Sequence, residues 1–203
     1  MKKILFIIDK IELKYFEFNN LVTNFWMIKE FLERGNQVFI TTISNLSLKQ
    51  DVAYTKCFET FTDKNNIFYK DIKIEKEIND FDLVMFRPDP PVDIDYINAT
   101  YIFDFVTKPK VINSPQAIRD FNEKLHSVYF KELMTDNIVT ASLEEIEEFL
   151  AKYKQIVLKP LNRCFGSGVM YLYEGDPNTR TIINTMTNNE TTLVMVQEFI
   201  PAV

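Results

Sequence analysis

Glycine is scarce in this chain, with four residues among 203. None of the four lies in the loop that follows the first predicted strand, residues 3–8, so the glycine-rich fingerprint of the usual dinucleotide-binding fold is excluded there. Two of them, Gly166 and Gly168, instead flank Ser167 in a single loop. This concentration indicates either a tight hairpin or a loop whose backbone closes over an anion.

Cysteine and histidine are also rare. Cys57 and Cys164 lie far apart without metal-ligand spacing, which favours two separate thiols over one disulfide. The single histidine, His126, has no nearby Asp or Cys partner pattern, so we interpret it as a packing or surface residue. From these residue types we predict neither a metal centre nor a nucleophile–base pair.

An excess of basic charge is missing as well. The net charge is −6 and the pI is about 5.0, which disfavours a nucleic-acid-binding surface. No apolar run approaches the roughly 20 residues that span a membrane. The apolar run at the N-terminus is broken at Asp9, so it fits a buried strand better than a signal peptide. We therefore expect a cytoplasmic protein with no membrane and no nucleic-acid partner.

Core-forming residues, in contrast, are plentiful. Apolar residues make up 46% of the chain, with 18 Phe and 9 Tyr, while charged residues make up 26%. This composition is typical of a folded globular protein rather than a disordered one. The length allows one large domain or two small ones.

The first half of the chain follows a strand–helix–strand order. Residues 3–8 form a continuous apolar run, 19–34 repeat apolar residues with a helical period, Gly35 is placed to end that helix, and 37–43 form a second strand. This order predicts a parallel sheet. Further along we predict β-like patches within 44–80, a strand at 81–86, a helix at 94–107, a strand at 110–114, a helix capped by Ser114 with Pro115 at its first position, and a helix at 123–134.

The second half follows a β-α-β-β-α-β order. We predict strands at 137–141, 155–160, 169–173 and 193–199, with helices after Ser142 and at 178–187. The sequence therefore predicts two domains, 1–122 and 123–203. The first is a parallel α/β domain, and the second is a small α/β sandwich.

Lys159 stands inside an apolar strand run, where burial of its charge is costly unless the charge is paired. It is either a lysine at the strand edge that reaches water or a phosphate ligand. The loop Gly166-Ser167-Gly168 strengthens the second interpretation, because glycine with positive φ lets backbone N–H groups face an anion.

Two further stretches are candidates for ligand contacts. Residues 197–200, Gln-Glu-Phe-Ile, close a strand and form either a solvent-facing end or the edge and apolar wall for a flat base. Arg87 and Asp89 lie in a proline-rich loop after a strand, where open α/β sheets bind ligands, so they either face a substrate or brace the loop.

Four blocks of sequence resemble the prokaryotic glutathione synthetases, a family of ATP-grasp ligases. These blocks are FDLVMFRPDPPVDIDYINATYI (81–102), VINSPQAIRDFNEKL (111–125), IVLKPLNRCFGSGV (156–169) and VQEFIPAV (196–203). The first two are specific to this family, whereas LKP with a glycine loop occurs in ATP-grasp enzymes in general.

The resemblance implies an N-terminal parallel α/β domain followed by an incomplete ATP-grasp domain, its first α+β subdomain. It also implies ATP-dependent joining of γ-glutamylcysteine to glycine through an acyl phosphate, with Mg²⁺. By position, Lys124 of NEKL and Lys159 of LKP look like phosphate-facing lysines. Gly166, Ser167 and Gly168 look like the phosphate flap. Gln197, Glu198, Phe199 and Ile200 look like the strand and hinge that hold adenine and ribose.

The chain departs from the family pattern in three places. The family sequence continues well past residue 203, and we expect the Mg²⁺ ligands in that further part. Arg163 and Phe165 stand where the family flap tends to have glycine, which makes this flap bulkier and stiffer. After the first strand, Asp9 is followed by Lys10 instead of proline, and residues 11–20 replace the family's lysine–aspartate segment.

Three hypotheses follow from these features. The chain is a glutathione synthetase-like ligase, truncated and inactive alone, which a chain supplying the C-terminal part could complement. Alternatively, it is a non-catalytic ATP-grasp-derived binding protein, or an ATP-grasp ligase that joins another acid and amine. The family resemblance also suggests a homo-oligomer.

Overall fold

The protein is described from a computed structural model that covers residues 1–14, 16, 21–64 and 66–201. The chain divides into two compact units, Met1–Asp120 and Phe121–Val203, which are treated one at a time below. None of the described helices has the length and apolar character needed to cross a membrane.

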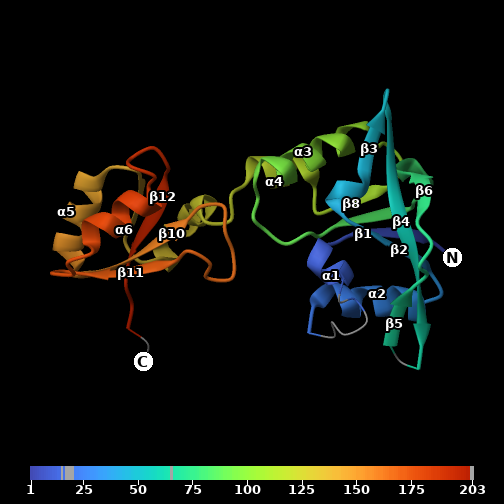
Figure 1. Ribbon diagram of the computed structural model, residues 1–203, viewed down its shortest axis with the longest axis horizontal. Coiled ribbons are helices and arrows are strands. Elements are labelled where there is room, and N and C mark those ends of the chain that lie inside the picture. The colour runs from blue at the N-terminus through green and yellow to red at the C-terminus, as the bar shows by residue number, and fades with distance from the viewer. Residues whose placement is uncertain (15, 17–20, 65, 202–203) are drawn as a thin grey trace. The chain divides into compact units, whose positions relative to one another are not determined.

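The first unit contains an eight-stranded sheet with helices on its faces (Figure 1). Its elements are β1 (Lys3–Ile7), α1 (Lys10–Lys14), α2 (Thr23–Glu33), β2 (Gln37–Thr41), η2 (Ile43–Asn45), β3 (Leu46–Lys49), β4 (Val52–Asp63), β5 (Asn66–Tyr69), β6 (Ile74–Glu77), η3 (Ile78–Asp80), β7 (Leu83–Phe86), α3 (Ile94–Ile102), η4 (Phe103–Phe105), β8 (Lys110–Ile112) and α4 (Pro115–Asp120).

Strand β1 lies in the middle of the parallel part of this sheet, between β2 and β7, and β8 follows β7. Successive β1 side chains enter opposite cores: Ile4 and Phe6 pack on the α2 side, while Leu5 and Ile7 pack on the α3 side. The continuous apolar run is therefore explained by burial on both faces. The predicted parallel α/β architecture is confirmed.

Helix α2 begins later than its apolar period predicted. Residues 19–20 of the predicted helix lie outside the described residues, and Leu21 lies before the helix with 94% of its surface exposed. The helix starts at Thr23, and its C-terminal turn is closed by Gly35 at φ +74°. Positive φ is the reason a glycine suits this position.

The region 44–80 forms an antiparallel extension of the sheet, which the sequence showed only as β-like patches. Strand β4 pairs antiparallel with β2, β3, β5 and β6. Its length of 12 residues lets different segments pair with different neighbours (Figure 1). Ala53, Thr55 and Cys57 alternate into the interior and anchor its register.

The second unit is a four-stranded antiparallel sheet in the order β11-β10-β12-β9. Its elements are η5 (Leu125–Leu133), β9 (Asn137–Thr140), α5 (Leu143–Tyr153), β10 (Gln155–Pro160), β11 (Met170–Tyr173), α6 (Thr179–Met186) and β12 (Val194–Glu198). Helices α5 and α6 pack on one face of the sheet through a core that includes Ile146, Ile183 and Leu158. We call the opposite face, which carries Val157, Lys159 and Gln197, the open face.

The segment 123–134 was predicted to be an α-helix, and this prediction is wrong. Residues 125–133 form 3₁₀ turns with a kink at Phe130 (φ −112°, ψ 42°). Tyr129, Phe130 and Leu133 are exposed, so an α-helix here would have no apolar face to bury. His126 packs against the rings of Phe121 and Tyr129, as expected for a packing residue.

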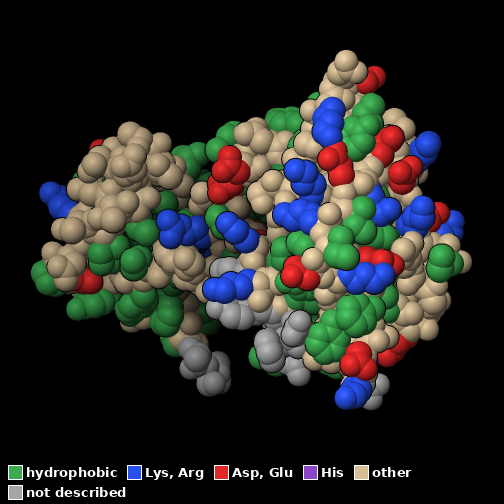
Figure 2. All heavy atoms as spheres, turned by 45° about the vertical axis from the view of Figure 1, so that its right-hand side comes forward, with side chains coloured by type: hydrophobic (Ala, Val, Ile, Leu, Met, Phe, Trp, Pro, Cys, Tyr) green, Lys and Arg blue, Asp and Glu red, His purple; other side chains and the backbone are tan. Residues whose placement is uncertain are grey.

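Charged side chains of the two signs are interspersed on the face of the molecule shown in Figure 2. Several pairs are ion pairs within one unit, such as Lys2 with Asp82 at 2.8 Å. Dissolved salt screens such exposed charges from one another beyond about 10 Å at 0.1 M ionic strength.

Candidate functional site

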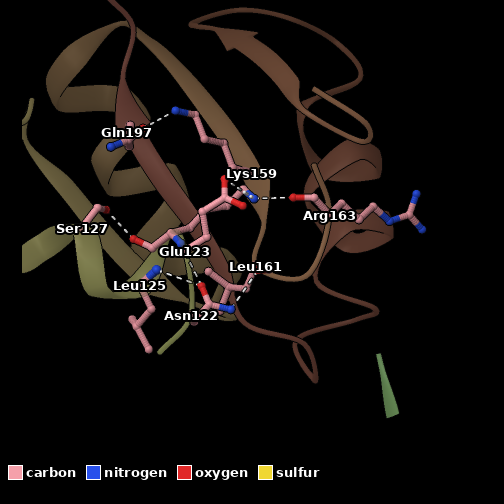
Figure 3. A network of polar contacts seen from close by, with 9 residues as sticks. Asn122, Glu123, Leu125, Ser127, Lys159, Leu161, Arg163 and Gln197 are labelled. Atoms are coloured by element: carbon pink, nitrogen blue, oxygen red, sulfur yellow. Dashed lines mark hydrogen bonds and ion pairs between the residues drawn. The ribbon is translucent and has the colours of Figure 1, made fainter. Parts of the chain in front are cut away.

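Lys159 lies on the open face of the second unit because of the strand alternation in β10. Ile156 and Leu158 are fully buried under the helices, so Val157 and Lys159 point the other way. The Lys159 ammonium donates a hydrogen bond to the side-chain carbonyl of Gln197 (Figure 3). The half-buried ammonium group of Lys159 therefore has a neutral amide as its hydrogen-bond partner.

Successive residues at the end of β12 lie on opposite faces of the sheet. Gln197 pairs with Val157 and faces Lys159, whereas Glu198 pairs with Ile156 on the helix side. The Phe199 amide donates to the carbonyl of Gln155 at 3.1 Å. Of the four predicted base-binding residues, Gln197 and Glu198 therefore belong to β12, and Phe199 continues its pairing with β10 by one hydrogen bond.

An aromatic surface lies on the open face at β11, on the other side of β10 from β12. The Phe199 ring meets the Tyr171 ring edge-on with centroids 4.8 Å apart, and Tyr173 lies beyond Tyr171 at 6.2 Å. Tyr171, Tyr173 and Ile200 are 45%, 47% and 65% exposed. These side chains offer an apolar platform on which a flat aromatic ligand can stack.

The glycine loop consists of two consecutive turns. The Ser167 amide donates to the Cys164 carbonyl at 2.9 Å, and the Val169 amide donates to the Gly166 carbonyl at 3.1 Å. Gly166 and Gly168 have φ of +70° and +72°. Two of the loop amides are thus engaged inside the loop, so anion binding by them would require the loop to rearrange.

Phe165 also has positive φ, +53°, and its side chain is 86% exposed. A bulky residue in this conformation is strained.

Gly168 is closely packed, because a Cβ added there would lie 3.1 Å from Pro160 Cγ. Gly168 therefore has a structural reason to be glycine as well as a proposed functional one.

Lys124 lies beside the start of this loop. Its ammonium donates to the backbone carbonyl of Arg163, and Glu123 is 3.8 Å away. Asn122 joins the same two segments, since its side-chain amide donates to the Leu161 carbonyl at 2.9 Å (Figure 3). Lys124 therefore lies beside the start of the loop that follows β10, and Lys159 lies near the end of β10 itself.

Arg163 points its guanidinium away from Lys159 in Figure 3, although its backbone carbonyl accepts the hydrogen bond from Lys124.

Sequence reasoning gave no role to Asn122. Its side-chain oxygen accepts from the amides of Lys124 and Leu125, each at 3.0 Å. The signal in the sequence was an Asn immediately before a turn of helix, where its side-chain oxygen can accept hydrogen bonds from the next backbone amides.

The two tentative substrate residues lie in the first unit, at the carboxyl ends of β1 and β7. The Arg87 amide donates to the Ile7 carbonyl at 3.0 Å, and the Asp89 amide donates to Asp9 Oδ2 at 2.7 Å. The Tyr96 hydroxyl donates to the Pro88 carbonyl at 3.1 Å, and burial raises the pKa of Tyr96 to about 12. The proline-rich loop is thus braced against β1 and α3.

Two buried polar residues that sequence reasoning missed lie next to Arg87. Asn24 on α2 accepts from Arg87 Nε at 2.6 Å and donates to both oxygens of Glu12 on α1, at 2.9 and 3.2 Å. Burial raises the pKa of the Glu12 carboxyl, and the hydrogen bond from Asn24 opposes that rise. Burial likewise raises the pKa of Asp9. Asn24 lies one helical turn before Ile28, on the buried stripe of α2. Its position in the helical repeat was the signal in the sequence that this polar side chain is buried.

Solved structures with a similar fold include an ATP-grasp protein and a D-alanyl-alanine synthetase. The RimK domain ATP-grasp protein from Sphaerobacter thermophilus matches with a TM-score of 0.61 and 16% identity, over 99% of this chain and 65% of that one. The D-alanyl-alanine synthetase A from Vibrio cholerae matches with a TM-score of 0.59 and 12% identity, over 98% and 60%. At these identities the likeness shows the fold alone, which is a parallel α/β unit followed by part of an ATP-grasp unit.

The family is shown by sequence. The family model for the N-terminal domain of prokaryotic glutathione synthetase matches residues 2–119, and the model for its ATP-grasp domain matches residues 123–203. The chain belongs to the prokaryotic glutathione synthetase family, which confirms the resemblance. The glutathione synthetase of Vibrio parahaemolyticus is 36% identical over 185 residues, and that of Buchnera aphidicola from Schizaphis graminum is 33% identical over 185 residues. The alignments cover 88% and 89% of this chain but 58% of each relative's length.

Proposed function

We propose that this chain provides the nucleotide-binding face and the acid-substrate end of an ATP-dependent ligase that joins γ-glutamylcysteine to glycine. The observation that carries the proposal is the placement of Lys159 near the end of β10 on the aromatic open face, with Lys124 at the start of the loop that follows β10. The family supports the reaction, whereas the residue roles below are proposed.

The two lysines bind the phosphates of ATP. Lys159 has an amide as its partner, and no carboxylate of the described residues forms an ion pair with it. Its charge is therefore available to a phosphate oxygen. Lys124 adds a second positive charge at the start of the glycine loop, and together they offset part of the triphosphate charge. Gly166, Ser167 and Gly168 close over the phosphates once the loop amides turn outward.

Adenine and ribose bind along the end of β12. Gln197, Phe199 and Ile200 supply a polar group and apolar surface there, next to Tyr171. The Glu198 amide already donates to the Asp136 carbonyl at 3.0 Å. Because the Glu198 side chain lies on the helix side, Glu198 contributes through its backbone carbonyl, which accepts a hydrogen bond from the base amino group.

In the proposed reaction, the terminal phosphoryl group of ATP moves to the carboxylate of γ-glutamylcysteine, which gives an acyl phosphate and ADP. The amine of glycine then attacks the acyl carbon, the amide bond forms, and phosphate leaves with the bonding electrons of the broken C–O bond. The protein binds and orients these groups and reduces their charge. Arg87 and Asp89 are proposed to face the peptide acid.

Mg²⁺ would offset part of the negative charge of the phosphates in such a reaction. The described residues contain no group of three or more His, Cys, Asp or Glu side chains that could hold a metal ion. We expect no ligase turnover from these 203 residues alone, and recovery of turnover when a chain carrying the remaining part of the relatives' length is added.

Calorimetric titration with Mg·ATP tests the nucleotide site. We expect binding by the wild-type chain and at least tenfold weaker binding by Lys159→Ala. Lys152→Ala is the matched control, because Lys152 is an exposed lysine of α5 on the helix side of the same unit. Equal affinity of Lys159→Ala and wild type would contradict the proposed role of Lys159.

A second candidate function is a binding protein without catalysis. The engaged amides of Ser167 and Val169, together with bulky Arg163 and Phe165 in the loop, favour it. Wild-type chain that binds no nucleotide at millimolar Mg·ATP would support this candidate over the ligase. A ligase for another acid and amine would instead bind ATP but fail to use γ-glutamylcysteine in the complemented assay.

A further inference from the structure

Burying Glu12 and Asn24 beside Arg87 is costly. The two residues are only 7% and 4% exposed, and apolar side chains would fill the same volume without the cost of desolvation. Burial, together with the nearby carboxylates of Asp89 and Asp9, raises the pKa of Glu12. The charged neighbour Arg87 does not contact this carboxylate directly, because the Asn24 amide stands between them.

Asn24 has a defined orientation in this arrangement. Its Nδ2 must face the Glu12 carboxylate, because the opposite orientation would place two acceptors together. Its Oδ1 therefore faces Arg87 Nε, at 2.6 Å. The Glu12 carboxylate therefore fixes the orientation of the Asn24 side-chain amide, and this amide in turn fixes the position of the Arg87 guanidinium.

The same arrangement determines which donors of Arg87 remain for a ligand. Nε is occupied by Asn24, and none of the described residues forms a hydrogen bond or ion pair with the two terminal amino groups. Arg34, Arg119 and Arg180, in contrast, each form an ion pair with a carboxylate. A planar guanidinium with two free terminal amino groups matches the two oxygens of one carboxylate.

We infer that Glu12 and Asn24 are positioning residues that hold Arg87 by its Nε, so that its two terminal amino groups bind a carboxylate of the ligand end-on. The geometry does not depend on the proposed function, but the identification of that ligand as γ-glutamylcysteine rests on it. Glu12 lies within residues 11–20, the segment where this sequence departs from the family pattern.

The positioning is tested by the NMR signal of the Arg87 Nε–H in the full chain, assigned with Arg87→Lys. We expect its exchange with solvent to be slowed at least tenfold relative to exposed Arg163. Asn24→Ala and Glu12→Ala should remove most of that protection. Glu12→Gln, which keeps an acceptor for Asn24 Nδ2, should retain it within about threefold. Arg119, held by Asp104 and Thr100, serves as an internal control for folding.

The ligand contact is tested by titrating the same sample with glutarate, a simple dicarboxylate, and separately with γ-glutamylcysteine. We expect the Arg87 signals to shift, with about tenfold weaker binding in Asn24→Ala and near wild-type binding in Glu12→Gln. Unprotected Arg87 in the wild type, or no response to either acid, would overturn the inference. A response to glutarate but not to γ-glutamylcysteine would support the inference and refute the substrate in the proposed function.

Discussion

Lys159 and Gln197 are joined by a side-chain hydrogen bond although 38 residues separate them. The contact is diagonal across β10 and β12, because Gln197 stands opposite Val157, two residues before Lys159. An amide partner orients the ammonium group without neutralising it. In a chain with a net charge of −6, this leaves a local positive charge where the proposed phosphates would bind.

Gln197→Glu should therefore weaken nucleotide binding. The new carboxylate would form an ion pair with Lys159 and would also repel the phosphates. We expect Mg·ATP affinity to fall about tenfold at low salt, measured by calorimetry. Gln197→Met, which removes the hydrogen bond without adding charge, should fall by a factor of about three or less. Stronger loss in the Met variant than in the Glu variant would contradict this electrostatic account.

The two glycines of the loop should respond differently to alanine. Gly166→Ala adds a methyl group in open space but at φ +70°, which should lower the free energy of unfolding by about 1 kcal/mol. Gly168→Ala adds the same backbone strain and a contact with Pro160 Cγ at 3.1 Å, so we expect a loss of about 2 kcal/mol. Chemical denaturation measures both, and equal losses would show that Pro160 moves away freely.

Phe165→Gly should stabilise the second unit. The Phe165 side chain is 86% exposed and loses little packing, while its positive φ is relieved by glycine. We expect a gain of about 1 kcal/mol in the free energy of unfolding, seen as a higher melting temperature. Asn162→Gly, at a residue of the same loop without positive φ, is the control and should destabilise. A drop in both variants would argue against strain at Phe165.

Cys57 links stability to alkaline pH. Burial raises the pKa of its thiol from 9.0 to about 11. Below about pH 9 both the folded and the unfolded thiol stay protonated, so no stability is lost. Between these two pKa values the unfolded thiol ionises first, so the free energy of unfolding falls by up to ~1.4 kcal/mol per pH unit.

Urea denaturation at pH 8 and at pH 10 measures this loss. Lysines and tyrosines also titrate in this range, so the wild type is compared with Cys57→Ala. We expect the wild type to lose roughly 1 kcal/mol more than the variant between the two pH values. The same decrease in both proteins would mean that Cys57 is not the group responsible.

Much of the fold followed from local patterns. The apolar run of β1 predicted a strand buried on both faces, and Ser142 predicted the start of α5, where its hydroxyl accepts from the Glu145 amide. The 3₁₀ conformation of 125–133 was not predicted, because the sequence does not show that Tyr129 and Leu133 find no partner to bury them. The pairing of β4 with four strands was missed because such contacts join distant residues.

The sequence by itself determined the order of the elements, the family and the residue types that can bind phosphate, because propensity, periodicity and motif spacing are local properties of the chain. Only the tertiary structure decided that Lys159 faces Gln197 and that Glu198 faces the helices, since this depends on strand register. It alone also brought Glu12, Asn24 and Arg87 together. Those three residues come from α1, α2 and the end of β7, and only the packing of both helices on the sheet places them within hydrogen-bonding distance.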